Sequence, residues 1–335
     1  MLGIPKFVRA ALLTAAATLA AAALVGCSSS SGRGLTLYNG QHEQTTAALV
    51  AAFEKATGIP VKIRSGDEGA LAAQIRQEAS SSPADVFYAG NTPALVSLDE
   101  RGMLAPVDPT TLAAVPAQYS SEAKTWVGVS ARVSGVIAKG QPPTSVLDLA
   151  KPEWKGKLGI APSETDFQPV IASVVKSLGH DGALAWLRAL KANAGSNEYP
   201  DNETLTTNVN KGNVQAGIVN HYYWYRLHQE QGHMDSAFTF FAPHDPGYVL
   251  NISGAAVLKS SPHQADAQKL LAFLVSAQGE SILAKSFSFE YPLGSSVAAN
   301  PALPPFDQLQ PAVLTPADIG DGSAAVTLLH EAQLA

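Results

Sequence analysis

The chain has 335 residues, of which 46% are hydrophobic and only 15% are charged, against about 25% charged residues in an average globular protein. It contains a single cysteine, Cys27, so disulfide scaffolds and cysteine-based zinc or iron–sulfur sites, which need several thiolates, are excluded. The formal net charge is −6 and there is no block of basic residues, which argues against nucleic acid as a partner.

The first residues have the pattern of a secretion signal. Lys6 and Arg9 precede an apolar run, residues 10–25, which is shorter than the roughly 20 residues needed to cross a bilayer. The run ends in Leu24-Val25-Gly26-Cys27, which resembles the bacterial lipobox, where cleavage leaves a lipid-bearing cysteine as the first residue.

We therefore expect a lipoprotein signal peptide at residues 1–26, lipidation of Cys27 and a serine-rich tether at residues 27–34. The alternative is a secreted protein that loses Cys27 together with its signal. The expected location is extracytoplasmic, with the chain anchored by lipid to the membrane at the cell surface or in the periplasm.

After the tether, apolar periodicity predicts alternating strands and helices. The expected strands lie at residues 35–38, 61–64, 85–88, 158–160 and 215–219. The expected helices lie at residues 42–56, 71–78, 183–192 and 203–210 and around 270–274. This order indicates an α/β fold with a largely parallel sheet, and two such series indicate two lobes with a cleft. Ligands of open α/β sheets bind beyond the carboxyl ends of strands, which directs attention to the loops after Tyr38, Tyr88 and Val219.

The sequence lacks the motifs of common enzymes. It has no P-loop, no G-x-G-x-x-G and no G-x-S-x-G. His42-Glu43 begins like a zinc-protease helix, but the second histidine one turn later is missing. An enzyme, such as a secreted hydrolase, remains possible at this point, although no residue is nominated as its nucleophile.

The segment Asn220-His221-Tyr222-Tyr223-Trp224-Tyr225 concentrates aromatic residues in a chain that is only 7% aromatic. One interpretation is an aromatic core segment. Another is a metal site, because adjacent side chains at a strand-to-helix corner diverge by only about 100°, so the phenol oxygens of Tyr222 and Tyr223 could reach one point. A free phenol has a pKa near 10. Only a strong Lewis acid such as Fe³⁺ deprotonates two phenols at neutral pH, whereas Ca²⁺ and Mg²⁺ prefer carboxylates, carbonyls and water.

Several segments resemble bacterial ferric-ion-binding proteins, which are the extracytoplasmic receptors of ABC iron importers and have the type II periplasmic-binding-protein fold. These segments lie in order between Leu35 and Leu293, at residues 38–43, 82–88, 152–157, 220–224, 253–261 and 290–293. The resemblance implies two Rossmann-like α/β lobes, joined by two crossing strands, that close over Fe³⁺ in the cleft. We expect the N-terminal lobe at residues 35–134 plus 242–298 and the C-terminal lobe at residues 135–241 plus 299–335.

The resemblance also implies a ligand set. Carried over by position, His42 would supply an imidazole nitrogen to the metal, and Tyr222 and Tyr223 would supply phenolates. Asn202 and Asn220, together with Ser163, fall where family members hold a synergistic anion, phosphate or carbonate; both asparagines could equally form turns. The expected partners are an ABC permease and the membrane through the lipid anchor, and the expected state is a monomer.

Two positions depart from the family pattern. Gly90 stands where family members commonly have a glutamate ligand, and the anion-holding loop reads Ser163-Glu164-Thr165-Asp166. One hypothesis is that Glu164 or Asp166 replaces the missing ligand or the anion. The other is that both carboxylates are solvated at a helix start, where the dipole favours them, with water in the vacant position. Gly90 also leaves open a receptor of the same fold that takes a small organic ligand on a stacking platform of Tyr222, Tyr223 and Trp224.

Overall fold

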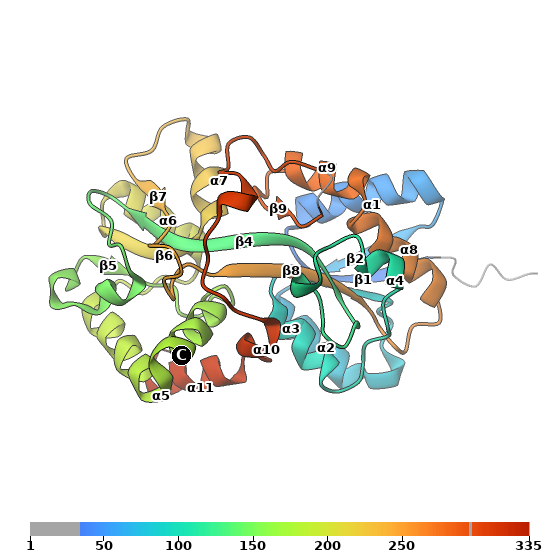
Figure 1. The fold of residues 1–335 in the computed structure, drawn as a ribbon, viewed down its shortest axis with the longest axis horizontal. Coiled ribbons are helices and arrows are strands. Elements are labelled where there is room, and N and C mark those ends of the chain that lie inside the picture. Colours follow the sequence, from blue (N-terminus) through green and yellow to red (C-terminus); the bar gives the residue numbers. More distant parts are fainter. Residues whose placement is uncertain (1–33, 295–296, 335) are drawn as a thin grey trace, which may run out of the picture. The chain divides into compact units, whose positions relative to one another are not determined.

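The computed structural model describes residues 34–294 and 297–334, so the expected signal peptide and Cys27 lie outside the described residues. Within those ranges nine strands form one sheet, in the order β2-β1-β3-β8-β4-β6-β5, with β7 and β9 also paired to β4 (Figure 1). The strands are β1 Leu35–Gly40, β2 Val61–Ser65, β3 Val86–Ala89, β4 Val127–Ala138, β5 Leu158–Gly159, β6 Ala216–Asn220, β7 Ala237–Thr239, β8 Leu250–Val257 and β9 Tyr291–Pro292.

Helices cover the sheet, with α1 packed on α8 and α9, α2 on α3, α6 on α7, and α5 on α10 and α11 (Figure 1). The α-helices are α1 Glu43–Thr57, α2 Glu68–Glu78, α3 Thr92–Asp99, α4 Pro109–Leu112, α5 Phe167–Ala194, α6 Asn202–Lys211, α7 His221–Gln231, α8 Gln264–Leu274, α9 Ala277–Lys285, α10 Pro316–Ile319 and α11 Ser323–Glu331. The 3₁₀ helices are η1 Ala79–Ser81, η2 Ala117–Tyr119, η3 Val146–Ala150, η4 Pro152–Trp154 and η5 Phe306–Gln308. No helix of the described part of the chain is long and apolar enough to cross a membrane.

The alternation of strands and helices in the first half of the chain is confirmed. Helix α1 ends where its sequence predicts, because Gly58 adopts a left-handed conformation with φ 71° and closes the last turn onto the carbonyl of Glu54. Helix α5 is longer than predicted and contains one non-helical residue, Gly179, with φ 73° and ψ 174°. That glycine separates the predicted segment 183–192 from an N-terminal half that begins beside the cleft.

The expectation of a largely parallel sheet is wrong, although the α/β class is right. Strands β1–β2, β1–β3 and β5–β6 pair in parallel, whereas β3–β8 and every pair that β4 makes are antiparallel. Local strand–helix alternation predicts parallel pairing only between neighbouring units. Strands β4 and β8 come from distant parts of the chain and run antiparallel to each other, a pairing that short-range patterns do not encode.

Strand β4 is the longest strand and changes partner along its length. Its first part, up to Val133, pairs with β8, and from Ser134 onwards it pairs with β6 (Figure 1). All twelve residues of β4 are buried. One of them is Arg132, and a buried charge is tolerated only when it is paired and hydrogen-bonded. The position of Arg132 therefore indicates where polar groups gather inside the molecule.

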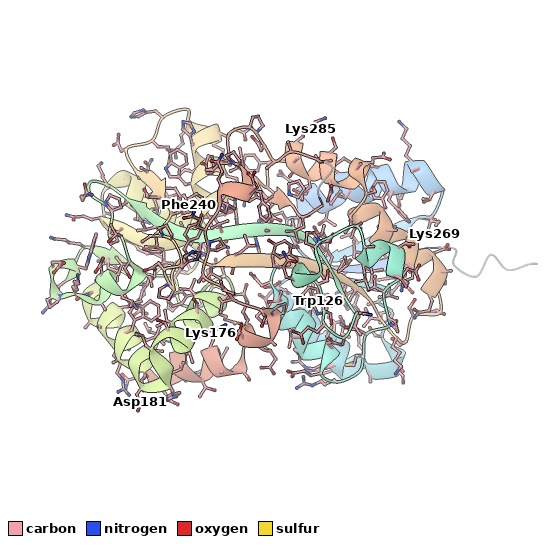
Figure 2. All side chains as sticks on the ribbon, in the orientation of Figure 1. Trp126, Lys176, Asp181, Phe240, Lys269 and Lys285 are labelled. Carbon is pink, nitrogen blue, oxygen red and sulfur yellow. The ribbon has the colours of Figure 1, made fainter. Side chains whose placement is uncertain are left out.

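The core extends over both faces of this sheet. Trp126, directly before β4, is 1% exposed and lies among the ribbons in Figure 2, whereas Lys269 and Lys285 extend outward from α8 and α9. Gly128 has no room for a side chain, because a Cβ there would lie 2.2 Å from the carbonyl oxygen of Tyr119. This close approach holds the start of β4 against η2 and fixes where the strand enters the sheet.

Candidate metal centre

Tyr222 and Tyr223 lie in the first turn of α7, directly after β6 ends at Asn220. Their ring centroids are 4.1 Å apart, and the planes are inclined by 33°. The hydroxyl of Tyr222 donates to Oδ2 of Asp166 at 3.0 Å, and that of Tyr223 donates to the same oxygen at 3.2 Å. The strand-to-helix corner thus brings both phenol oxygens to one point, as its sequence predicts.

The carboxylate that the two phenols share is buried and held in place. Asp166 directly precedes α5 and is 6% exposed, so it is not a solvated helix-start residue. Its other oxygen, Oδ1, accepts from Nδ2 of Asn91 at 3.1 Å and lies 3.6 Å from Nη1 of Arg132. One carboxylate therefore connects the tyrosine pair to the loop after β3 and to strand β4.

Glu164, the other acidic candidate, lies at the edge of the cleft. It is half-buried, and its Oε1 accepts a hydrogen bond from the backbone N of Asn202 at 3.0 Å. Burial, and then the nearby Asp166, raise the pKa of Glu164 to about 7. Glu164 lines the cleft, but it makes no hydrogen bond to either tyrosine among the described residues.

Both phenols are protonated at neutral pH. Burial raises the pKa of Tyr222 and of Tyr223 well above 10, and the negative charge of Asp166 raises it further. A weakly charged ligand could not remove these protons. A highly charged cation could, because it would replace two protons among three oxygen donors whose combined charge, once both phenols ionise, is −3.

Arg132 occupies the space beside Gly90. Its Nη2 donates to the carbonyl oxygen of Gly90 and to Oδ1 of Asn91, the latter at 2.8 Å. A Cβ on Gly90 would lie 3.3 Å from both terminal nitrogens of Arg132 and 3.2 Å from the carbonyl oxygen of Gly40. The missing side chain at position 90 is thus what allows the guanidinium to lie here and reach Asp166.

Glu68 is a buried acid of this cleft that the sequence patterns did not single out. It is 5% exposed and accepts hydrogen bonds from the backbone N of Asn91 at 2.7 Å and from its Nδ2 at 2.8 Å. Burial raises the pKa of Glu68, with Arg132 acting in the opposite direction. Its two hydrogen bonds to Asn91 give Glu68 a clear role in holding the loop after β3.

His42 lines the same cleft and is the residue directly before α1. Its ring centroid is 4.9 Å from that of Tyr222, with the planes inclined by 73°. Its Nε2 lies 3.3 Å from Oε1 of Glu290, a carboxylate that is fully buried. Burial alone would raise the pKa of Glu290, but His42 and Arg132 outweigh that effect and hold it below its ordinary value.

His221 is a structural residue next to the tyrosine pair. It is fully buried, its Nδ1 accepts from the backbone N of Val133 at 3.1 Å, and its Nε2 donates to the carbonyl oxygen of Phe289 at 2.6 Å. Burial lowers the pKa of His221 to about 4, so it is neutral at physiological pH. It locks the tyrosine corner to strand β4.

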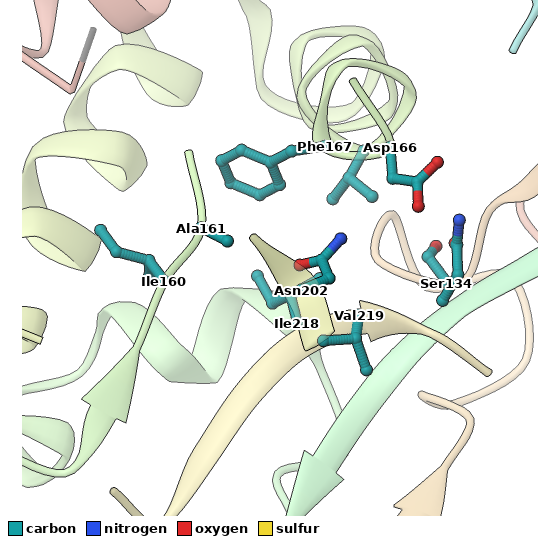
Figure 3. A pocket seen from close by; sticks show the side chains of 10 residues that line it. Ser134, Ile160, Ala161, Asp166, Phe167, Asn202, Ile218 and Val219 are labelled. Carbon is teal, nitrogen blue, oxygen red and sulfur yellow. The ribbon is translucent and has the colours of Figure 1, made fainter. Parts of the chain in front are cut away.

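The three residues expected to hold an anion lie in different surroundings. Ser163 is exposed and donates to the carbonyl oxygen of Pro200 at 3.2 Å. Asn202 and Asn220 are buried and line, with Asp166 and Ser134, a cavity of about 20 Å³ (Figure 3). Oδ1 of Asn220 accepts from Asn251 at 2.9 Å, while its Nδ2 has no partner among the described residues. A space of this size holds about one water molecule and is too small for phosphate.

The cleft is a separate opening of about 320 Å³ whose donors differ from those of common metal sites. Its walls carry His42, Gly90, Glu164, Asp166 and the two tyrosines. Within residues 34–294 and 297–334, no three His, Cys, Asp or Glu side chains are grouped so that they could hold a metal. Any metal here would therefore depend on the tyrosine oxygens.

The fold and the site define a class: a two-lobed α/β binding protein whose cleft presents phenol, carboxylate and imidazole groups. Residues 36–287 match the family described as bacterial extracellular solute-binding protein, and the chain belongs to this family. It is 38% identical to the Fe(3+)-binding periplasmic protein of Serratia marcescens, over 91% of this chain and 92% of that protein. It is 35% identical to the major ferric iron-binding protein of Neisseria meningitidis, over 97% and 98% of the two chains.

Solved structures of iron-bound proteins have the same fold as this chain. Iron-bound HitA from Pseudomonas aeruginosa superimposes with a TM-score of 0.85 at 40% identity, covering 90% of this chain and 99% of HitA. A Trichodesmium protein (IdiA, FutA) in complex with iron and citrate superimposes with a TM-score of 0.79 at 29% identity, covering 90% and 100%. The two-lobed fold expected from the sequence is therefore confirmed.

Proposed function

We propose that this chain is an extracytoplasmic receptor that binds Fe³⁺ in its cleft and delivers it to an ABC importer. The observation that carries the proposal is the convergence of the Tyr222 and Tyr223 hydroxyls on one oxygen of Asp166, at 3.0 and 3.2 Å. His42, whose ring lies 4.9 Å from that of Tyr222, supplies the imidazole. The relatives named for ferric iron support the same substrate.

Asp166 supplies the negative charge that a synergistic anion, phosphate or carbonate, would otherwise bring to the site. With both phenols ionised, two phenolates and one carboxylate carry three negative charges, which match the charge of Fe³⁺. The burial of Asp166 and the small size of the cavity beside Asn202 and Asn220 favour iron binding without phosphate or carbonate. Glu164, which bonds to Asn202, is the less favoured replacement ligand.

The proposal is tested by adding Fe³⁺ to the iron-free protein and recording its visible spectrum. A tyrosinate-to-iron charge-transfer band should appear, and Tyr222→Phe or Tyr223→Phe should abolish or strongly weaken it. Acidification of the folded protein should release the iron, because protons compete for the phenolates. If the protein stays colourless with Fe³⁺ but closes on binding a small organic molecule, the organic-ligand alternative is correct and the proposal is wrong.

We also propose the cellular setting and the division into lobes. Lys6, Arg9 and the sequence ending in Cys27 support a signal peptide at 1–26 and a lipid anchor, and Cys27→Ser should shift the protein from the membrane to the soluble fraction. The change of partner of β4 at Ser134 supports lobes at 35–134 plus 242–298 and 135–241 plus 299–335. A monomer and an ABC permease partner complete the proposal.

A further inference from the structure

Glu290 is a buried acid in contact with His42 that does not itself line the cleft. It is 0% exposed, whereas the His42 side chain is 22% exposed and faces the cleft. Oε1 of Glu290 and Nε2 of His42 lie 3.3 Å apart, within ion-pair distance, and neither atom makes a hydrogen bond in the described residues. Because burying a carboxylate costs free energy unless it is paired and hydrogen-bonded, we ask what Glu290 contributes beside His42.

The same acid belongs to a network that also holds the backbone of His42. Oε2 of Glu290 accepts from Oγ of Ser130 on β4 and from Nε2 of Gln41 at 3.2 Å. Oε1 of Gln41 accepts from the backbone N of His42 at 2.8 Å, and its Nε2 also donates to Oγ of Ser253 on β8 at 2.9 Å. The backbone and the imidazole of His42 are thus both tied to the two long strands through one set of hydrogen bonds.

The backbone directly before Glu290 is held in an unusual conformation. Phe289 has a φ of 52°, which a bulky residue rarely adopts, and its carbonyl oxygen accepts from Nε2 of His221 at 2.6 Å. Such a conformation persists only where the surroundings over-determine it. Because His221 adjoins Tyr222 in the sequence, the segment that carries Glu290 is tied to the tyrosine corner as well.

We propose that Glu290 is a positioning residue for the metal site: it engages Nε2–H of His42 and leaves Nδ1 to ligate the ferric ion. A neutral imidazole has one N–H donor and one lone pair, so a partner on Nε2 selects the tautomer with its lone pair on Nδ1. Nδ1 of His42 has no hydrogen-bond partner within residues 34–294 and 297–334. This inference rests on the proposed function.

The test is a double-mutant cycle with Glu290→Gln, His42→Ala and both together. Iron affinity is measured by competition with a chelator, and the nitrogen ligand is followed by ¹⁴N couplings in pulsed EPR of the ferric protein. Glu290→Gln should weaken iron binding by about 10–100-fold and alter the ¹⁴N coupling, while the tyrosinate band stays. In the His42→Ala background the same change should have no further effect.

Glu280→Gln is the matched control, because Glu280 is also buried but accepts from the backbone N of Gly294 and does not line the cleft. It should bind iron as the unaltered protein does. If Glu290→Gln does not fold, Glu290→Asp keeps the acid but shortens its reach, and the same loss is expected.

Unchanged ¹⁴N coupling in the Glu290 variant, or an equal loss of affinity with and without His42, overturns the inference. Absence of the tyrosinate band in the unaltered protein would instead overturn the proposed function.

Discussion

Asp166 places one carboxylate oxygen within 3.2 Å of both tyrosine hydroxyls, while Gly90 contributes no side chain to the cleft. In the proposed site the acidic donor therefore comes from the residue before α5 and not from position 90 in the loop after β3. The guanidinium of Arg132 fills the space next to Gly90 and lies 3.6 Å from Asp166. Arg132 therefore links the two positions, because it lies beside Gly90 and also close to the Asp166 carboxylate.

This coupling predicts iron binding that does not need an added anion. Titration with Fe³⁺ should give the same affinity with and without phosphate or carbonate. Asp166→Ala should weaken binding at least tenfold, because it removes one of three negative donors and leaves Arg132 without that partner. It should also make binding depend on phosphate, which could enter the space vacated by the carboxylate.

Glu164→Ala is the control for this experiment, since Glu164 is a nearby acid without a hydrogen bond to the tyrosines in the described structure. Its affinity for iron should stay within about threefold of the unaltered protein. Strict phosphate dependence of the unaltered protein would contradict the role given to Asp166.

Single-residue patterns predict part of this site. The aromatic segment predicts the meeting of Tyr222 and Tyr223, because a strand-to-helix corner is a local feature. Arg132 could have been noticed as the one charge in the apolar run that forms β4, and such a charge must be paired. Glu290 has no such signal, since its contact with His42 joins residues far apart in the chain.

Among the elements, the junction of β6 and α7 depends on His221. Its ring accepts from Val133 on β4 and donates to Phe289, and the bond from Val133 requires a neutral imidazole because a protonated Nδ1 cannot accept. The pKa of His221 is lowered from 6.5 to about 4 by burial. The folded state therefore disfavours the protonated form, and the stability that the neutral form contributes is complete above pH 6.5 and is lost as the pH falls towards 4.

We expect this group to remove about 3 kcal/mol from the free energy of unfolding between pH 7 and pH 4. The two pKa values differ by about 2.5, which corresponds to about 3.5 kcal/mol at about 1.4 kcal/mol per pH unit, and most of this difference is lost by pH 4. Urea unfolding of the iron-free protein measures it. His221→Gln should be less stable at pH 7 but should lose less stability on acidification. Parallel pH profiles of the two proteins would show that His221 does not titrate on unfolding.

The elements also show what local patterns miss. The strands β1, β2 and β3 and helix α1 follow from periodicity and from Gly58. The antiparallel β4 and β8 do not, because their pairing joins residues such as Arg132 and Asn251, whose meeting depends on the whole topology. The crossing strands were expected only from the resemblance to a family.

On the scale of the whole molecule, Asp166 links the two proposed lobes. It lies in the C-terminal lobe of the proposed division, together with both tyrosines. It accepts a hydrogen bond from Asn91 in the N-terminal lobe and lies 3.6 Å from Nη1 of Arg132, which belongs to the same N-terminal lobe. Hydrogen bonds to charged groups contribute about 1.5–3 kcal/mol each. The bond from Asn91 alone is enough to shift an open–closed equilibrium by about tenfold or more, at about 1.4 kcal/mol per factor of ten, and the charge of Arg132 acts in the same direction.

The iron-free receptor should therefore be closed already, and iron should enter during brief openings. Small-angle X-ray scattering should give the same radius of gyration with and without iron for the unaltered protein. Asn91→Ala should enlarge the iron-free form only, because it breaks the contact to Asp166 while keeping both tyrosines and the carboxylate as ligands. Asn208→Ala is a suitable control, since its side chain bonds within α6 and to Asn213. If the unaltered iron-free protein is expanded and contracts on adding iron, closure depends on the metal and the Asp166 contacts are too weak to hold the lobes together.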